Sequence, residues 1–98
     1  MTRFEWSETK AHTNLQKHQV SFEIAARVFA DPFAITQQDR IEHAEYRWQT
    51  LGAVEGYLLL LVAHTVRSEV DGSEVIRIIS ARRADRKETT MYEQASSA

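Results

Sequence analysis

Apolar residues recur at helical spacing twice in the first third of the chain. Ser7 and Ser21 stand where N-cap residues belong, and an acidic residue follows each of them in the first turn. The first pattern predicts a helix that ends near Lys17 or His18. The second ends at Asp31-Pro32, because the residue before a proline is disfavoured in helical geometry. The apolar positions of the two predicted helices are Ala11, Leu15, Phe22, Ala25, Ala26, Val28 and Phe29.

The rest of the chain changes to an alternating pattern, which is typical of strands. Asp71-Gly72 marks a tight turn between the two longest strands, and residues 52–56 predict a hairpin connection. Residues 37–44 are polar and predict a loop, and a closing helix is expected from about Ala84 to Ala95. The predicted strands are Phe4–Trp6, Phe33–Thr36, Glu45–Leu51, Tyr57–Arg67 and Glu74–Arg82.

This order predicts an α+β fold, with a small antiparallel sheet packed with two N-terminal helices and one C-terminal helix. Residues Leu58–Val62 are all apolar, so we expect both faces of the sheet to be covered, by helices or by another chain. At 98 residues the chain is large enough for one modest core. We therefore expect a single domain over residues 1–95 and a frayed tail over residues 96–98.

Composition narrows the classes of function. No apolar run approaches the roughly 20 residues that span a bilayer, and the N-terminus lacks the apolar stretch of a signal peptide. With no cysteine, the chain has neither a disulfide framework nor a thiolate nucleophile. The histidines lack the spacing of metal ligands and there is no glycine-rich phosphate loop, so we expect no metal or other cofactor. These features favour a small cytoplasmic domain that does not enter a membrane.

The strongest chemical signal lies at the end of the last predicted strand. Arg82 and Arg83 follow a run of β-branched residues, and Arg86 and Lys87 come just beyond them. Guanidinium groups bind phosphate oxygens in pairs and stabilise charge that develops on phosphate. The formal net charge of the whole chain is −2, so nucleic-acid binding would depend on this local cluster rather than on a long basic track. The alternative is that Arg82 and Arg83 only form ion pairs with acidic residues of the last helix.

A set of residues in order along nearly the whole chain forms a recognisable pattern. Its members are Phe4-Glu5-Trp6, Lys10, Asn14, Lys17-His18, Val20-Ser21-Phe22-Glu23, Val28-Phe29, Asp31-Pro32, Glu45, Arg47, Leu51-Gly52, Thr65, Arg67, Ile76-Arg77-Ile78-Ile79-Ser80-Ala81-Arg82 and Tyr92-Glu93. This set resembles the BrnT toxins, the ribonuclease components of BrnT–BrnA type II toxin–antitoxin pairs. The chain departs from that family at Gln19, where glycine is usual and where we expect a differently shaped turn, and at Ser7, where aspartate is usual.

The resemblance implies a RelE-like fold and a ribonuclease that cleaves RNA without a metal. Such an enzyme activates the ribose 2′-hydroxyl, stabilises a phosphorane-like transition state and protonates the leaving oxygen. Arg82 is the first choice for stabilising the transition state, followed by Arg83 and Arg67. His18 and Tyr92 are the candidate proton donors or acceptors, with packing in the interior as the alternative for both. The candidate RNA-binding residues are Lys17, Arg47, Arg77, Arg86 and Lys87.

Three functions from different classes remain open at this point. The leading hypothesis is a toxin that cleaves RNA to inhibit translation and growth, held by a BrnA-like antitoxin in a heterotetramer and contacting DNA only through that antitoxin. The second is a non-catalytic nucleic-acid-binding or co-repressor subunit that acts with a DNA-binding antitoxin. The third is an interaction domain whose arginines are structural. Cleavage of RNA by the purified protein separates the first hypothesis from the second.

Overall fold

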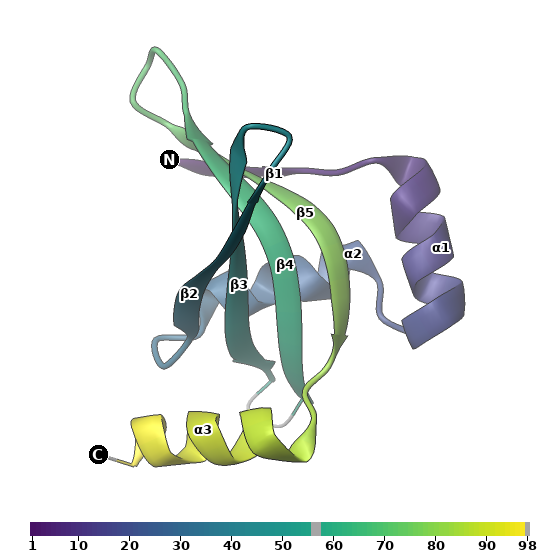
Figure 1. Cartoon of the computed structure of the whole chain (residues 1–98), viewed down its shortest axis with the longest axis vertical. Helices are drawn as coiled ribbons and strands as arrows, with labels where there is room; N and C mark the ends of the chain where they lie inside the picture. The colour runs from purple at the N-terminus through teal and green to yellow at the C-terminus, as the bar shows by residue number, and fades with distance from the viewer. Residues whose placement is uncertain (56–57, 98) are drawn as a thin grey trace.

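A mixed sheet flanked by helices forms the protein, and Figure 1 shows the arrangement. The computed structural model describes residues 1–55 and 58–97. Gly56 and Tyr57, which belong to the predicted hairpin and strand start, and Ala98 of the predicted tail lie outside the described residues. The elements are β1 (Thr2–Glu5), α1 (Glu8–His18), α2 (Phe22–Ala25), the 3-10 helix η1 (Ala26–Ala30), β2 (Ile35–Glu42), β3 (Glu45–Val54), β4 (Leu58–Ser68), β5 (Glu74–Arg83) and α3 (Arg86–Ser96).

The strand order in the sheet is β1-β5-β4-β3-β2. Strands β2 to β5 form the predicted antiparallel meander. The expectation of a wholly antiparallel sheet is wrong at one edge, because β1 runs parallel to β5, with Glu5 opposite Arg77. The first strand of the chain thus lies beside the last, which makes this pairing a long-range one that local patterns do not reveal. The α+β class itself is confirmed.

The polar segment from Gln37 to Ala44 was predicted to be a loop, and this prediction is wrong. Strand β2 continues through it to Glu42, paired with β3 and interrupted by a register shift between Gln38 and Ile41. Because β2 is an edge strand with mostly exposed side chains, backbone pairing holds it in place without an apolar face. His43 and Ala44 form the connecting turn with φ values of 52° and 63°, as expected for a two-residue hairpin loop.

The helices begin at the predicted N-cap residues. The hydroxyl of Ser7 accepts a hydrogen bond from Lys10 N at 3.3 Å, and that of Ser21 accepts one from Ile24 N at 3.1 Å. The second predicted helix is only partly α-helical, because it tightens into η1 after one turn. It ends before Pro32 as predicted, with Asp31 in an extended conformation. The closing helix α3 extends to Ser96, one residue into the segment predicted to fray.

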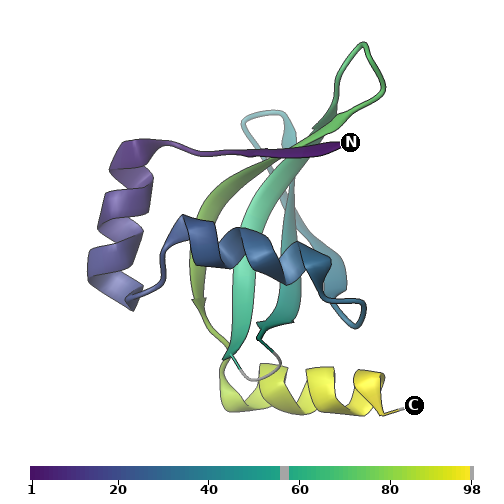
Figure 2. The same ribbon diagram turned by 180° about the vertical axis from the view of Figure 1, so that it is seen from behind.

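The core lies between the sheet and one layer of helix. Figure 2 shows α2 and η1 crossing one face of the sheet, and Phe22 and Val28 are fully buried there against Leu60 and Val62 of β4. Gly52 permits this close packing, since a Cβ at that position would lie 3.0 Å from the Val28 side chain. The opposite face is only partly covered, by α3 at one end (Figure 1), so the expected cover on both faces is incomplete within the described residues. We call this second side the open face.

Candidate nucleic-acid interface

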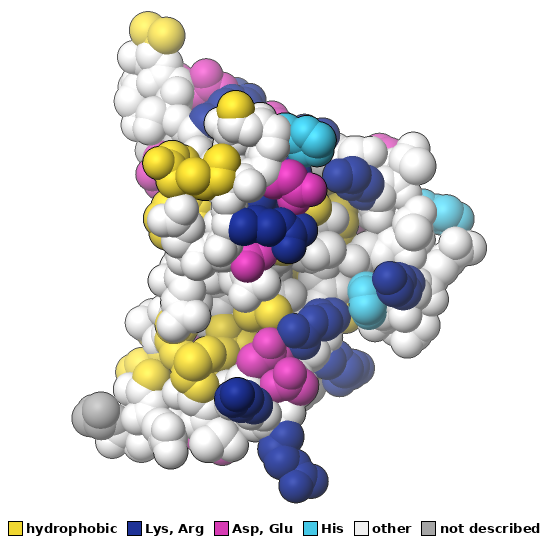
Figure 3. All heavy atoms as spheres, in the orientation of Figure 1, with side chains coloured by type: hydrophobic (Ala, Val, Ile, Leu, Met, Phe, Trp, Pro, Cys, Tyr) yellow, Lys and Arg dark blue, Asp and Glu magenta, His cyan; other side chains and the backbone are white. Residues whose placement is uncertain are grey.

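The open face carries arginines from three neighbouring strands. Successive side chains of a strand point to opposite faces of the sheet, and residues that are opposite each other in neighbouring strands point to the same face. Arg77 is opposite Thr65, and Arg67 lies two residues further along the same strand as Thr65. Arg47 also points to the open face, because the next residue, Trp48, is opposite the buried His64. Lys and Arg side chains accordingly gather over the middle of this face and towards α1 and α3 in Figure 3.

Arg82 occupies the end of β5, where it is held by a carboxylate of α3. Its two terminal nitrogens donate to the two carboxylate oxygens of Glu88, each at 2.8 Å, and one of them also donates to the Arg83 carbonyl at 3.1 Å. The hydrogen bonds from Arg82 lower the pKa of Glu88, although burial acts in the opposite direction. The same carboxylate accepts from Asp85 N at 2.9 Å and completes the capping box of α3. The strand-end arginine is therefore fixed in position by the first turn of the last helix.

Arg83 points to the other side of the sheet. It lines a groove with Leu15 and Ile24 of the N-terminal helices and Leu58 of β4. Because successive residues of a strand face opposite sides, the adjacent arginines do not form one cluster. Arg83 makes no ion pair with any described residue.

Arg67 and Arg77 converge on one carboxylate, that of Glu5 in β1. Arg67 donates to both oxygens of Glu5, at 2.8 and 3.0 Å, and Arg77 donates to one of them at 2.9 Å. These hydrogen bonds, first from Arg67 and then from Arg77, lower the pKa of Glu5 to about 2. Glu69 makes a longer contact with Arg67, at 3.3 Å, and is shared with Arg3.

Lys17 and His18 lie at the end of α1 and border a cleft between that helix and β5. Ser80 of β5 and Lys10 of α1 line the same cleft. His18 is half-buried and Lys17 is exposed, so the cleft presents an imidazole and an ammonium group beside the strand that carries Arg82. The structure thus brings His18 to the edge of the open face.

Three further predicted RNA-binding residues differ in their surroundings. Arg47 is half-buried in the sheet, and its Nε has no hydrogen-bond partner among the described residues. Arg86 and Lys87 lie in the first turn of α3 and line a shallow groove with Met91. Within the described ranges none of these three cations has an acidic partner within ion-pairing distance. Their charge is therefore available to a bound anion.

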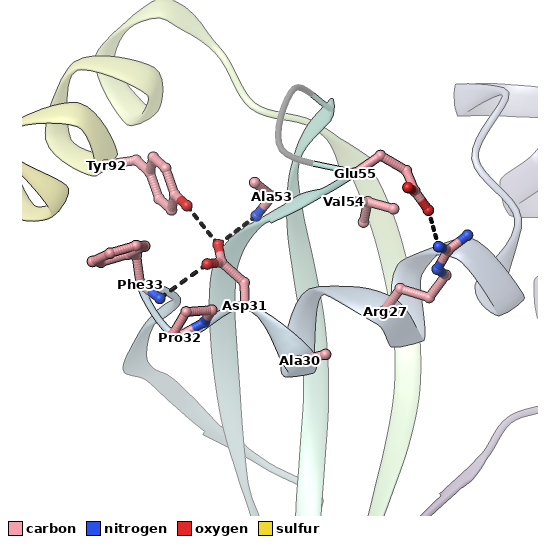
Figure 4. A pocket seen from close by; sticks show the side chains of 9 residues that line it. All are labelled: Arg27, Ala30, Asp31, Pro32, Phe33, Ala53, Val54, Glu55 and Tyr92. Carbon is pink, nitrogen blue, oxygen red and sulfur yellow. Dashed lines mark hydrogen bonds and ion pairs between the residues drawn. The ribbon is translucent and has the colours of Figure 1, made fainter.

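A hydrogen bond to Asp31 holds the side chain of Tyr92, a residue of α3. Figure 4 shows its hydroxyl pointing to Asp31, to which it donates at 2.6 Å. Asp31 also accepts from Ala53 N at 2.8 Å and from Phe33 N at 2.9 Å. Burial and the hydrogen bond to Asp31 raise the pKa of Tyr92 to about 12. Burial alone would raise the pKa of Asp31, but its three donors outweigh burial and lower that pKa.

Pairing of Arg82 with an acidic residue of the last helix was the alternative that the sequence offered, and Glu88 forms that pair. Sequence reasoning missed the other two carboxylates that organise the site, Glu5 and Asp31. Glu5, Glu88 and Asp31 each bind a residue that was a candidate for catalysis. Only Glu88 carried a local signal, because an acidic residue three positions after Asp85 is the sequence signature of a capping box. Glu5 lies 62 residues from Arg67 and Asp31 lies 61 residues from Tyr92, so no local pattern could have paired them.

Residues 1–55 and 58–97 contain no group of three or more histidine, aspartate or glutamate side chains placed to hold a metal ion. The helices in those ranges are too short and too polar for any of them to cross a membrane.

The fold and the open face define a small α+β protein whose sheet presents arginines suited to binding phosphodiesters. Residues 6–88 match the family model described as ribonuclease toxin, BrnT, of type II toxin–antitoxin system. The chain therefore belongs to the BrnT family, which confirms the predicted ribonuclease toxin and implies an antitoxin partner.

A solved structure agrees with this assignment. The chain is similar to the ribonuclease toxin BrnT of Brucella abortus, known from a crystal structure at 1.1 Å resolution. The two are 25% identical with a TM-score of 0.63, and the match covers 88% of this chain and 99% of the Brucella chain. No curated protein matched the chain in a sequence search.

Proposed function

We propose that the protein cleaves RNA on the open face of its sheet without a metal ion. The observation that carries the proposal is the placement of Arg47, Arg67, Arg77 and Arg82 on the same face, most of which the helices of residues 1–55 and 58–97 leave uncovered. Fixed guanidinium groups supply the positive charge that a phosphorane-like transition state requires. The near-neutral whole chain keeps non-specific affinity for RNA modest, which suits a catalyst better than a stable binder.

The proposed reaction is attack of the ribose 2′-hydroxyl on the adjacent phosphorus, with departure of the 5′-oxygen of the next nucleotide. Arg82 binds the non-bridging oxygens as negative charge builds on them, and Glu88 holds the guanidinium in place beforehand. His18, at the edge of the same face, is the proposed proton acceptor or donor. Lys17, Arg86 and Lys87 position the flanking phosphates.

Two earlier candidates have no role in this proposed reaction. Arg83 faces the groove on the opposite side of the sheet, beside Leu58. The Tyr92 hydroxyl donates to Asp31, and a phenol whose pKa is raised to about 12 is poorly matched to proton transfer near neutral pH. These residues instead provide matched controls for substitutions on the open face.

The decisive experiment compares Arg82→Ala with Arg83→Ala. The purified proteins are incubated with RNA in EDTA, and the cleavage rate and melting temperature are measured for each. Arg82→Ala should lower the rate on the order of a hundredfold or more, because a transition-state charge contact is lost. Arg82→Lys should restore only part of the rate, since an ammonium cannot reproduce the paired donors. Arg83→Ala should cleave like the parent protein.

Equal rates for Arg82→Ala and the parent would reject Arg82 as a catalytic residue. Loss of parental cleavage in EDTA, restored by a divalent ion, would reject the metal-free mechanism. The melting temperature separates both results from simple unfolding, because the Arg82–Glu88 pair is partly exposed and should contribute only modestly to stability.

We further propose that the antitoxin is BrnA-like, that it forms a heterotetramer with this chain in the cytoplasm, and that DNA is contacted only through it. An apolar stripe on the helix-bearing face supports partner binding. Phe4 and Val66 both lie opposite Ile76, and Ile41 lies opposite Tyr46, which shares its face with Trp48. The four stripe residues Phe4, Val66, Tyr46 and Ile41 are between 38% and 61% exposed, an unusual arrangement for aligned apolar side chains of a monomer.

A further inference from the structure

Glu5 is bound by two arginines in the way that a phosphate group would be. The carboxylate bridges Arg67 of β4 and Arg77 of β5 through three hydrogen bonds of 2.8 to 3.0 Å. Both guanidinium groups lie on the open face, and their side chains are 52% and 44% exposed, so a ligand from solvent can reach them. Paired guanidinium donors bind phosphate oxygens with the same planar geometry that they use for carboxylates.

We propose that Arg67 and Arg77 form a second phosphate subsite, and that Glu5 occupies it as an internal carboxylate which RNA must displace. The inference rests on the proposed RNA cleavage on the same face. The ligand class is a phosphodiester at a nucleotide away from the cleaved bond. Exchange of one singly charged anion for another keeps the local charge balanced, so the two guanidinium groups are never left side by side without a counter-charge.

We expect a competing anion, rather than a change of pH, to displace Glu5 from the two arginines. Because the pKa of Glu5 is lowered to about 2 by its arginine partners, a change of pH within the physiological range leaves it ionised. The backbone of β1 stays paired with β5 from Thr2 to Glu5, so the side chain alone has to turn away. Glu5 is tethered beside the arginines at a high effective concentration, and it therefore weakens the binding of every RNA phosphate at this subsite.

The test compares Glu5→Gln with Glu69→Gln in the purified full chain. Both substitutions remove one negative charge near Arg67, but Glu69 makes only one contact with it, at 3.3 Å. The probe is an RNA oligonucleotide methylated at every 2′-hydroxyl, which cannot undergo attack by that group, and the dissociation constant is measured by fluorescence anisotropy in EDTA. Glu5→Gln should bind it about five- to tenfold more tightly than the parent, with a steeper salt dependence equivalent to about one further phosphate contact.

Two further variants sharpen the result. Adding Arg77→Gln to Glu5→Gln should remove the gain in affinity, because the subsite is then incomplete. Glu5→Asp keeps the charge but shortens the side chain, so it can no longer reach both arginines and should give a smaller gain. Unchanged affinity in Glu5→Gln, an equal gain in Glu69→Gln, or no binding of the probe by any variant would overturn the proposal.

Cleavage of unmodified RNA by the parent protein is measured in parallel. Failure of cleavage together with tighter probe binding by Glu5→Gln would reject the proposed catalytic function and leave the subsite standing. Normal cleavage together with unchanged probe affinity in Glu5→Gln would reject the second phosphate subsite and leave the proposed catalytic function standing. The two proposals can therefore fail independently.

Discussion

At the scale of single residues, carboxylates determine how Arg82 and Arg67 are held. Glu88 binds Arg82 with two hydrogen bonds and is itself tied to the helix N-terminus through Asp85. Because Glu88 already orders the long Arg82 side chain, little side-chain entropy is lost when that arginine binds a phosphate. Glu5 binds Arg67 equally closely but lies at the sheet edge. Glu88 thus positions Arg82, whereas in our proposal Glu5 competes with a phosphate for Arg67 and Arg77.

The Tyr92–Asp31 hydrogen bond predicts a particular pH dependence of stability. Because the pKa of Tyr92 is raised to about 12 in the folded protein, its contribution is complete below the ordinary pKa near 10 and is lost as the pH rises towards 12. Because the pKa of Asp31 is lowered, its contribution is present above the ordinary carboxyl pKa and is lost as the pH falls through the folded value. Tyr92→Phe should reduce the free energy of unfolding by about 1 kcal/mol at neutral pH and flatten the alkaline decline.

Urea unfolding from pH 3 to pH 12 measures this effect. Tyr46→Phe is the matched control, because Tyr46 is 57% exposed and its hydroxyl makes no hydrogen bond with any described residue. A Tyr92→Phe profile that parallels the parent through the alkaline range would show that the hydrogen bond contributes nothing to folding.

At the scale of elements, Asn14 closes the edge of β5 where β1 no longer covers it. Strand β1 pairs with β5 only as far as Arg77. Beyond it, the buried Asn14 side chain donates to the Ala81 carbonyl at 2.9 Å and accepts from Ala81 N at 3.0 Å, as a neighbouring strand would. It also donates to the Val20 carbonyl at 3.0 Å. One side chain of α1 thus satisfies a strand edge and joins the helix to the sheet.

Asn14→Ala should therefore destabilise the protein by about 2–4 kcal/mol, because it leaves buried backbone groups of Ala81 and Val20 without partners. Chemical denaturation of Asn14→Ala and Gln16→Ala measures the difference. Gln16 is exposed on the same helix, and its replacement should change stability by less than about 0.5 kcal/mol. Similar losses in the two variants would mean that the edge contact is unimportant.

The end of α1 offers a stabilising substitution. We expected a differently shaped turn at Gln19 from the sequence, but Gln19 adopts the left-handed conformation that favours glycine, with φ 58° and ψ 30°. That conformation is strained for a residue with a Cβ, and glycine removes the strain at some cost in unfolded-state entropy. Gln19→Gly should raise the free energy of unfolding by roughly 0.5–1 kcal/mol.

Gln16→Gly should change the free energy of unfolding in the opposite direction. It places glycine within the helix and should lower that free energy by about 1 kcal/mol. Thermal melting of both variants provides the comparison. A Gln19→Gly protein that melts below the parent would show that the side chain of Gln19, which donates to the Gln16 carbonyl at 3.0 Å, outweighs the backbone strain.

At the scale of the whole molecule, the two faces of the sheet are suited to different partners. The open face presents arginines, and the helix-bearing face presents the apolar stripe of Phe4, Val66, Tyr46 and Ile41. Leu59 and Leu61 on the open face are only half-buried, so apolar surface remains there as well. We therefore propose that the antitoxin binds the apolar stripe.

We expect this chain and its antitoxin to sediment as a heterotetramer at micromolar concentration. Val66→Lys should weaken that complex by about tenfold or more, because it places a charge within the apolar stripe. Phe33→Lys is the control, since Phe33 is 56% exposed but lies outside the stripe. Sedimentation of the parent as a monomer in the presence of antitoxin would contradict the assembly, and equal effects of the two variants would contradict the assigned surface.

The sequence by itself determined the elements whose signals are local. N-cap residues Ser7 and Ser21 mark the helix starts, and Asp71-Gly72 marks the turn between the two longest strands. These features depend on contacts between residues that are close in the chain, and they were sufficient for the α+β class. The functional class came from residues spread over the chain that resemble one family, and the family model confirms it.

Only the tertiary structure decided which of these residues act together. Arg82 and Arg83 are neighbours in sequence, but their side chains point to opposite faces of the sheet because successive residues of β5 alternate between the faces. The parallel pairing of β1 with β5 brings Glu5 to Arg67 and Arg77 across more than sixty residues. Such contacts depend on how distant strands assemble around a shared core, and the free energy of that assembly is not encoded in any local pattern.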